Sequence, residues 1–153
     1  MYRDLWTADK YMYKVEPVVA DGGRVIIYAP RVLEISEAYG ELIRKIGYHT
    51  RDYFLAQWDR FKEVPLAILT HFAHVRGIGT YRKGVEYDRI EVILSTGISE
   101  SECRMVNLGY QDPEGIRVDD YASLKNEGDS LVPKAGEMLH RLADGSVPDI
   151  DKL

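Results

Sequence analysis

The sequence predicts an α/β fold: a three-layer αβα, Rossmann-like arrangement with a mostly parallel sheet in a single domain. Short apolar runs rich in β-branched residues, such as residues 25–29, lack the polar alternation of a half-exposed strand. Such runs indicate strands covered on both faces. They alternate with segments of helical periodicity, which favours parallel strands joined by helices. A length of 153 residues with a 45% apolar fraction suits one domain with its own core.

Four segments are expected to supply the strands of this sheet. Residues 25–29 follow an Asp-Gly-Gly turn and end at Pro30, and residues 66–70 follow Pro65. A third strand is expected over residues 90–94, and a last one is expected to begin at Leu131. Glycine and proline at the borders of short apolar runs are typical of strands between turns.

Helices are expected between these strands. Asp4 is a candidate N-cap for an amphipathic helix over residues 5–20, and Gly47 a candidate C-cap for a helix over 33–46. Thr50 is expected to cap a helix that runs to about Lys62. Further helices are expected over residues 101–108 and 119–125, with a long surface loop or hairpin over 75–89. The domain is expected to span residues 1–142 and to be followed by a flexible tail over 143–153.

Composition excludes several classes of function. Cys103 is the only cysteine, so an internal disulfide and a multi-cysteine metal site are excluded. We expect Cys103 to be a half-buried helical residue and not a nucleophile. A net charge of −5 argues against a nucleic-acid partner. The charged start of the chain is unlike a secretory signal, and the apolar runs are too short to span a membrane, which together indicate a cytoplasmic protein.

The chemically suggestive motifs each have a plainer interpretation. His71 and His74 have metal-ligand spacing, but on the expected strand they would point to opposite faces, so we interpret them as polar histidines and expect no metal on this chain. Residues 76–80 contain two glycines that could form an anion-binding nest, although a flexible loop is the favoured interpretation. Residues 96–100 are interpreted as a capping turn between a strand and a helix.

Several segments, taken in order, resemble the C-terminal domain of lactate racemase and its relatives. The resemblance covers most of the chain, and the ordered combination carries it. The matching segments are Trp6-Thr7-Ala8-Asp9-Lys10, residues 19–27, Gln57-Trp58, residues 66–70 and residues 91–97.

This resemblance implies one of two α/β domains with an active site in the cleft between them. The family interconverts the configurations of 2-hydroxy acids with a nickel-pincer nucleotide, whose lysine and histidine attachments lie in the N-terminal domain. The implied partners of this chain are therefore that N-terminal domain, on the same or a separate chain, and a small 2-hydroxy acid. The chain is expected to bind no cofactor alone and to be inactive alone.

The resemblance also names site residues. The family has a Gln-x-x-Lys pair here; Lys10 matches the lysine, whereas Thr7 replaces the glutamine and Trp6 replaces the preceding tyrosine. Lys10 is thus implied as the catalytic, substrate-orienting cation, with Trp6, Thr7 and Trp58 lining the substrate. The two replacements favour a 2-hydroxy acid other than lactate. From the residues alone, Lys10 could equally be a solvated helix lysine and Trp58 a core residue, and a non-catalytic binding or interaction module that retains the fold is the alternative function.

Overall fold

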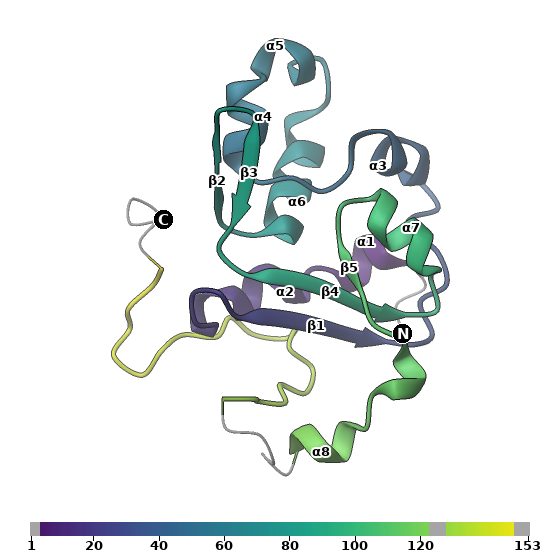
Figure 1. The fold of residues 1–153 in the computed structure, drawn as a ribbon, viewed down its shortest axis with the longest axis vertical. Helices are drawn as coiled ribbons and strands as arrows, with labels where there is room; N and C mark the ends of the chain where they lie inside the picture. The colour runs from purple at the N-terminus through teal and green to yellow at the C-terminus, as the bar shows by residue number, and fades with distance from the viewer. Residues whose placement is uncertain (1–3, 123–127, 149–153) are drawn as a thin grey trace.

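The computed structural model describes residues 4–122 and 128–148. A sheet and a hairpin are surrounded by short helices (Figure 1). The elements are α1 (Leu5–Ala8), α2 (Tyr11–Val15), the 3₁₀ turn η1 (Glu16–Val18), β1 (Arg24–Ala29), α3 (Gly40–Ile46), α4 (Arg51–Ala56), α5 (Trp58–Phe61), α6 (Leu66–Arg76), β2 (Gly79–Arg82), β3 (Val85–Asp88), β4 (Glu91–Thr96), α7 (Glu100–Met105), β5 (Gly109–Tyr110), the 3₁₀ turn η2 (Pro113–Gly115) and α8 (Val118–Ala122).

The central sheet is parallel, with the strand order β1-β4-β5. In its register Arg24 pairs with Glu91 and Ala29 with Thr96, while β5 joins the other edge of β4. Residues 92–96 of β4 are all buried, so the middle strand is covered on both faces. A separate antiparallel pair, β2 and β3, projects beside α4 and α6 (Figure 1). The predicted α/β class with a mostly parallel sheet is confirmed.

Two predicted strands are wrong. Residues 66–70 begin helix α6, whose buried residues Leu69, Phe72 and Val75 recur every three positions along one face. A short apolar run has no period that separates a buried strand from a buried helix, and leucine and alanine favour the helix. Leu131 and Val132 lie in irregular backbone without a strand partner. The third strand of the sheet is instead β5, which the sequence analysis did not identify.

Several predicted helices are broken or shorter than expected. The one capped by Thr50 divides into α4 and α5 at Gln57, and the one over 101–108 ends at Met105. The segment 5–20 breaks into α1, α2 and η1, and Pro17 lies in the 3₁₀ turn. Of the segment 33–46 only Gly40–Ile46 is helical. The carbonyl groups of Glu34 and Ile35 accept hydrogen bonds from the backbone of Leu5 and Trp6, both at 3.0 Å. Because those carbonyls serve the first turn of α1, they are not available for a helix of their own.

The predicted turns and caps are confirmed where local chemistry decides them. Asp4 accepts a hydrogen bond from the Thr7 amide at 3.3 Å, and Thr50 accepts one from the Tyr53 amide at 3.4 Å. Gly47, with a φ of 81°, ends α3. Of the two interpretations of residues 75–89, the hairpin is correct.

The segment over residues 128–148 runs outside the sheet (Figure 1). Its backbone contacts α2, where the His140 amide donates to the Lys14 carbonyl at 2.9 Å. The helix predicted over 119–125 is present as α8 up to Ala122, and its remaining residues lie outside the described part of the chain. Residues 143–148 contain no helix or strand, and 149–153 are also outside the described part. In the described ranges no helix is long and apolar enough to cross a membrane.

Candidate functional site

Three of the predicted site residues lie together at the N-terminal end of the chain. Trp6 and Thr7 belong to α1, and Lys10 is the residue that precedes α2. The Thr7 hydroxyl donates a hydrogen bond to Asp4 Oδ1 at 2.5 Å. The side chain of Lys10 is exposed. Lys10 is therefore accessible to solvent, whereas Trp6 in the same segment is half-buried.

A buried carboxylate lies immediately before Lys10. Asp9 is fully buried, and its Oδ2 atom accepts a hydrogen bond from the Tyr48 hydroxyl at 3.1 Å and lies 3.3 Å from Nε2 of His71. Burial raises the pKa of Asp9, while the interactions with His71, Tyr48 and Lys10 act to lower it. Burial, and then the charge of Asp9, raise the pKa of Tyr48 well above its usual range. The Tyr48 hydroxyl therefore keeps its proton and donates a hydrogen bond to Asp9.

The ring of Trp6 is held between two other rings. Its centroid lies 3.7 Å from that of His71 and 4.6 Å from that of Tyr39. His71 therefore contacts the N-terminal segment twice, through its Nε2 edge toward Asp9 and through its face toward Trp6. The planes of the Trp6 and His71 rings are tilted by 35°, and close contacts of this kind between aromatic rings are favourable.

The position of His71 and His74 differs from the sequence prediction. Both belong to helix α6 and not to a strand end, so residues three apart lie on neighbouring parts of one helical surface. His74 is exposed, with its ring centroid 5.3 Å from that of Tyr13. Partial desolvation, and secondarily the nearby His71, lower the pKa of His74. Over residues 4–122 and 128–148, no three His, Cys, Asp or Glu side chains are grouped so that they could hold a metal ion.

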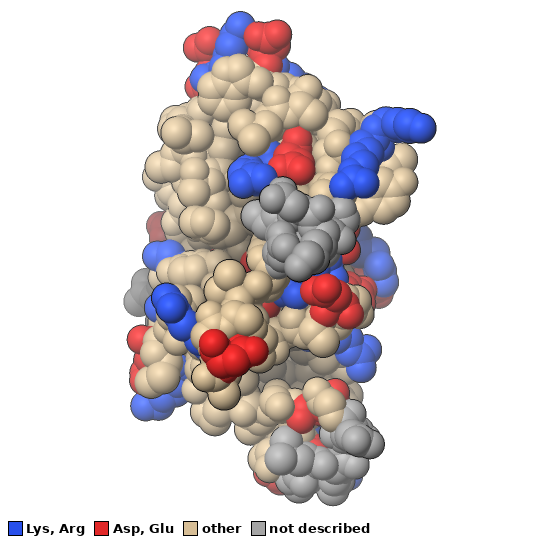
Figure 2. Space-filling model, turned by 90° about the vertical axis from the view of Figure 1, so that its left-hand side faces the viewer, with Lys and Arg blue, Asp and Glu red and all other residues tan. Residues whose placement is uncertain are grey.

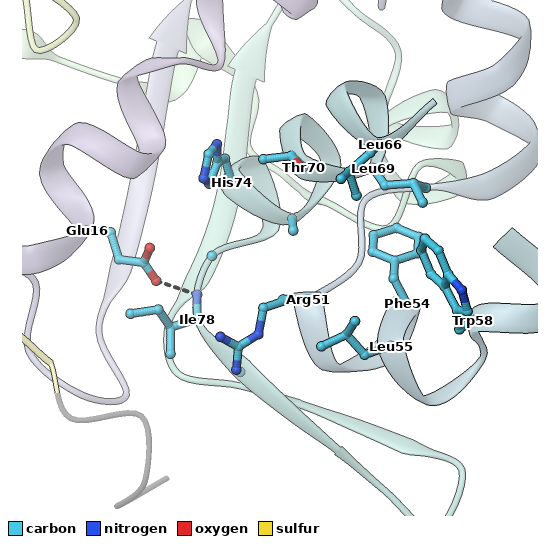
Figure 3. A pocket seen from close by; sticks show the side chains of 13 residues that line it. Glu16, Arg51, Phe54, Leu55, Trp58, Leu66, Leu69, Thr70, His74 and Ile78 are labelled. Carbon is cyan, nitrogen blue, oxygen red and sulfur yellow. Dashed lines mark hydrogen bonds between the residues drawn. The ribbon is translucent and has the colours of Figure 1, made fainter. Parts of the chain in front are cut away.

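The fourth predicted site residue lies elsewhere, in a cavity of about 380 Å³ beside α6. Trp58 stands at one end of it with Phe54, and Glu16 and Ile78 stand at the other (Figure 3). The remaining lining residues are Arg51, Leu55, Leu66, Leu69, Thr70, Ala73, His74, Gly77 and Gly79. Trp58 is 43% exposed, so it is not a core residue. Trp6, Thr7 and Lys10 are not among the lining residues, and the structure therefore brings three of the four predicted residues together but not the fourth.

The glycine segment after α6 binds a carboxylate of the protein itself. The amide of Ile78 donates to Glu16 Oε1 at 2.5 Å, and Gly77 has a φ of 88°. Glu16 is buried, and burial raises its pKa despite this hydrogen bond and the charge of Arg89. A single amide of residues 76–80 thus binds a carboxylate, that of Glu16, while the Gly77 amide donates to the Ala73 carbonyl. The favoured interpretation as a flexible loop is wrong, because β2 begins at Gly79.

Comparison with known proteins yields one solved structure. A crystal structure of a protein from Thermotoga maritima is 37% identical in sequence, with a TM-score of 0.81. The similarity covers 90% of this chain and 34% of that chain. This chain shares its fold with about a third of that protein. No protein-family model and no curated protein matches the sequence.

The charged side chains on one face and the lone cysteine are two further candidates for reactive groups. On the face shown in Figure 2, the visible described residues of both charge signs are interspersed among uncharged ones. Cys103 lies on α7 and is fully buried rather than half-buried as predicted. Burial raises the pKa of its thiol to about 11, so the thiolate is scarce at neutral pH. Ser99 caps α7 by accepting from the Glu102 amide at 3.3 Å, which confirms the capping interpretation of residues 96–100.

Sequence reasoning missed Asp9, Tyr48 and His71 as a cluster. Two of them were visible as parts of motifs, Asp9 next to Lys10 and His71 in the spaced histidine pair. The helical propensity of residues 66–76 was the signal that could have placed both histidines on one surface. Nothing in the sequence pointed to Tyr48, which follows Gly47 in the connection between α3 and α4.

Proposed function

We propose that this chain is the C-terminal, substrate-cleft domain of a cytoplasmic nickel-pincer-dependent 2-hydroxyacid racemase or epimerase. Lys10 is its substrate-orienting cation, and Trp6, Thr7 and Trp58 contact the substrate. The observation that carries the proposal is the arrangement at the end of α1: the exposed Lys10 directly follows the buried, hydrogen-bonded Asp9, and Trp6 of the same segment contacts His71. The chain's correspondence to about a third of a longer Thermotoga maritima protein suits a domain that works with another.

In this proposal the chain binds and orients, and the cofactor belongs to the N-terminal domain. The cofactor, when bound there, supplies hydride transfer at the carbinol carbon. In the described part of this chain no three His, Cys, Asp or Glu side chains are grouped so that they could hold a metal ion, and we assign none of the nickel ligands here. The ammonium of Lys10 holds the substrate carboxylate, and this fixed charge keeps the substrate in place while its configuration changes.

The contacts of Thr7 support a substrate other than lactate. Thr7 gives its single hydroxyl hydrogen to Asp4, so toward a substrate its oxygen can only accept a hydrogen bond. A glutamine at this position would offer both a donor and an acceptor. We therefore assign to Thr7 an acceptor role toward a substrate that carries a hydrogen-bond donor near this position. The identity of that 2-hydroxy acid is left to a screen of both enantiomers of a panel.

The test is substitution of Lys10 in an enzyme that contains both this chain and the cofactor-bearing domain. Lys10→Met keeps the aliphatic stem and removes the charge, and Lys45→Met, an exposed lysine of α3, is the matched control. Loss of a preorganised charge contact costs about a hundredfold or more in turnover, while the melting temperature should stay unchanged. Interconversion of enantiomers is followed by chiral chromatography on the same preparations.

Two outcomes contradict this proposal. A Lys10→Met enzyme that keeps its rate within about threefold shows that the lysine is only a solvated surface residue. Complete absence of interconversion for every 2-hydroxy acid tried, with a fully loaded cofactor domain, favours the non-catalytic module that retains the fold.

A further inference from the structure

We propose that Asp9, held by His71 and Tyr48, is a positioning residue for the Lys10 site. Its carboxylate fixes the backbone at the junction of α1 and α2. This sets the position of the Lys10 backbone relative to the substrate and the orientation of the Trp6 ring. This inference rests on the role proposed above for Lys10, and it adds three residues to the site.

The first support is that one carboxylate joins three separate parts of the chain. Asp9 ends α1, Tyr48 belongs to the connection between α3 and α4, and His71 belongs to α6. Both partners contact the same oxygen, Oδ2, at 3.1 and 3.3 Å. The Asp9 backbone is fixed as well, because its amide donates to the Leu5 carbonyl at 2.8 Å. The end of α1 is therefore tied both along the helix and across the core.

The second support is the energetic cost of the cluster. Asp9 is fully buried, and its Oδ1 atom has no hydrogen-bond partner among the described residues. Such a partly satisfied buried carboxylate costs stability, and an apolar side chain of similar volume would usually be as stable or more so. Retention of a costly buried group is characteristic of functional sites, where it sets the position or charge of neighbouring groups.

The third support is what lies on either side of Asp9. Trp6 precedes it by three residues, so both side chains lie on one side of α1, and both contact His71. Lys10 follows it directly and is close enough for its charge to lower the pKa of Asp9. The cluster thus fixes the start of the lysine side chain and the stacked face of the indole, while the ammonium at the end of the stem stays exposed.

The experiment is a double-mutant cycle between Asp9→Asn and Lys10→Met in the enzyme that contains both domains. Asp9→Asn keeps the shape and removes the charge, and Asp119→Asn, an exposed aspartate of α8, is its control. Misplacement of a substrate-binding group by about 1 Å can cost about a hundredfold, so we expect a loss of that order in kcat/KM from Asp9→Asn alone. In the Lys10→Met background the same change should cost clearly less, because only the effect of Asp9 through Trp6 remains.

A second measurement needs no cofactor and no turnover. The sequence has two tryptophans, so in a Trp58→Phe background Trp6 is the only one. Release of His71 from Asp9 should loosen the stack, shift Trp6 emission to the red and increase its quenching by acrylamide. Tyr48→Phe removes one hydrogen bond to the carboxylate and keeps the ring, so it should give a smaller shift in the same direction. It also serves as the test variant if Asp9→Asn does not fold.

The outcomes separate the two proposals. If Lys10→Met leaves turnover intact, the proposed function fails and the assignment of Asp9 to that site fails with it. If the Lys10→Met enzyme loses turnover but Asp9→Asn lowers kcat/KM equally with and without Lys10, the proposed function stands and the positioning role is wrong. An unchanged Trp6 emission maximum in folded Asp9→Asn protein overturns the positioning role as proposed, because the carboxylate then does not fix the Trp6 ring.

Discussion

Glu86 connects the hairpin to the helix that lines the cavity, and its substitution should loosen that wall. From β3, its Oε1 atom accepts from the Thr50 amide at 2.5 Å and its Oε2 atom lies 2.8 Å from Nδ1 of His49. The other ring nitrogen of His49 lies 3.1 Å from the Ile46 carbonyl. Since Thr50 caps α4, this carboxylate determines where α4 begins.

The expected loss of stability follows from the interactions that Glu86→Gln keeps and those that it removes. A glutamine oxygen can still accept from the Thr50 amide, but the charge that pairs with His49 is gone. One hydrogen bond to a charged group contributes about 1.5–3 kcal/mol, so we expect a loss of about 2 kcal/mol in the free energy of unfolding. For a chain of this length that corresponds to a fall of about 4–8 °C in melting temperature. Glu63→Gln, an exposed glutamate outside this network, should change the melting temperature by less than about 1 °C.

The pKa of Glu86 predicts how the stability difference between wild type and Glu86→Gln changes with pH. Burial alone would raise the pKa of Glu86, but the hydrogen bonds from His49 and Thr50 outweigh burial and leave the pKa below its usual range. A carboxylate with a depressed pKa adds stability above its unfolded pKa, and that stability is lost as the pH falls through the folded value. The gap between wild type and Glu86→Gln should therefore be full at pH 7 and shrink below about pH 4. Thermal melts by circular dichroism across this range measure it, and a gap that is absent at pH 7 or grows in acid would refute the reasoning.

Two further predictions concern buried groups. The Arg89 guanidinium donates hydrogen bonds to the Val19 carbonyl and to Asp21 at 2.8 Å each and to the Glu16 carbonyl at 2.6 Å. Arg89→Met should therefore lower the free energy of unfolding, measured in urea, by about 3–5 kcal/mol. A loss below about 1 kcal/mol would show that these hydrogen bonds contribute little. Cys103 is fully buried, and burial raises the pKa of its thiol to about 11. The native protein at pH 8 should therefore not react with a disulfide reagent such as DTNB until it is unfolded. Rapid labelling of the native protein would contradict this burial.

Features that depend on a few neighbouring residues could be predicted from the sequence. The caps at Asp4, Thr50 and Ser99 and the helix end at Gly47 follow from side-chain oxygens or a left-handed φ within one turn of the chain. The strands β1 and β4 were predicted because their uniform apolar character reflects cover on both faces. Lys10, Trp6 and Thr7 could be named from a resemblance, which gave their identity but not their surroundings.

Features that depend on distant partners needed the tertiary structure. Residues 66–70 could have been strand or helix, and the helix is what places His71 beside Trp6 and Asp9. Asp9 is 39 residues from Tyr48 and 62 from His71 along the chain, so no local sequence pattern predicts their contacts with one another. The sequence by itself determined the α/β class, the strands β1 and β4 and several helix caps, since these follow from short-range backbone chemistry and burial. The grouping of Asp9, Tyr48 and His71 behind Lys10 was decided only by packing, because three chain segments must fold together before one buried carboxylate can contact them all.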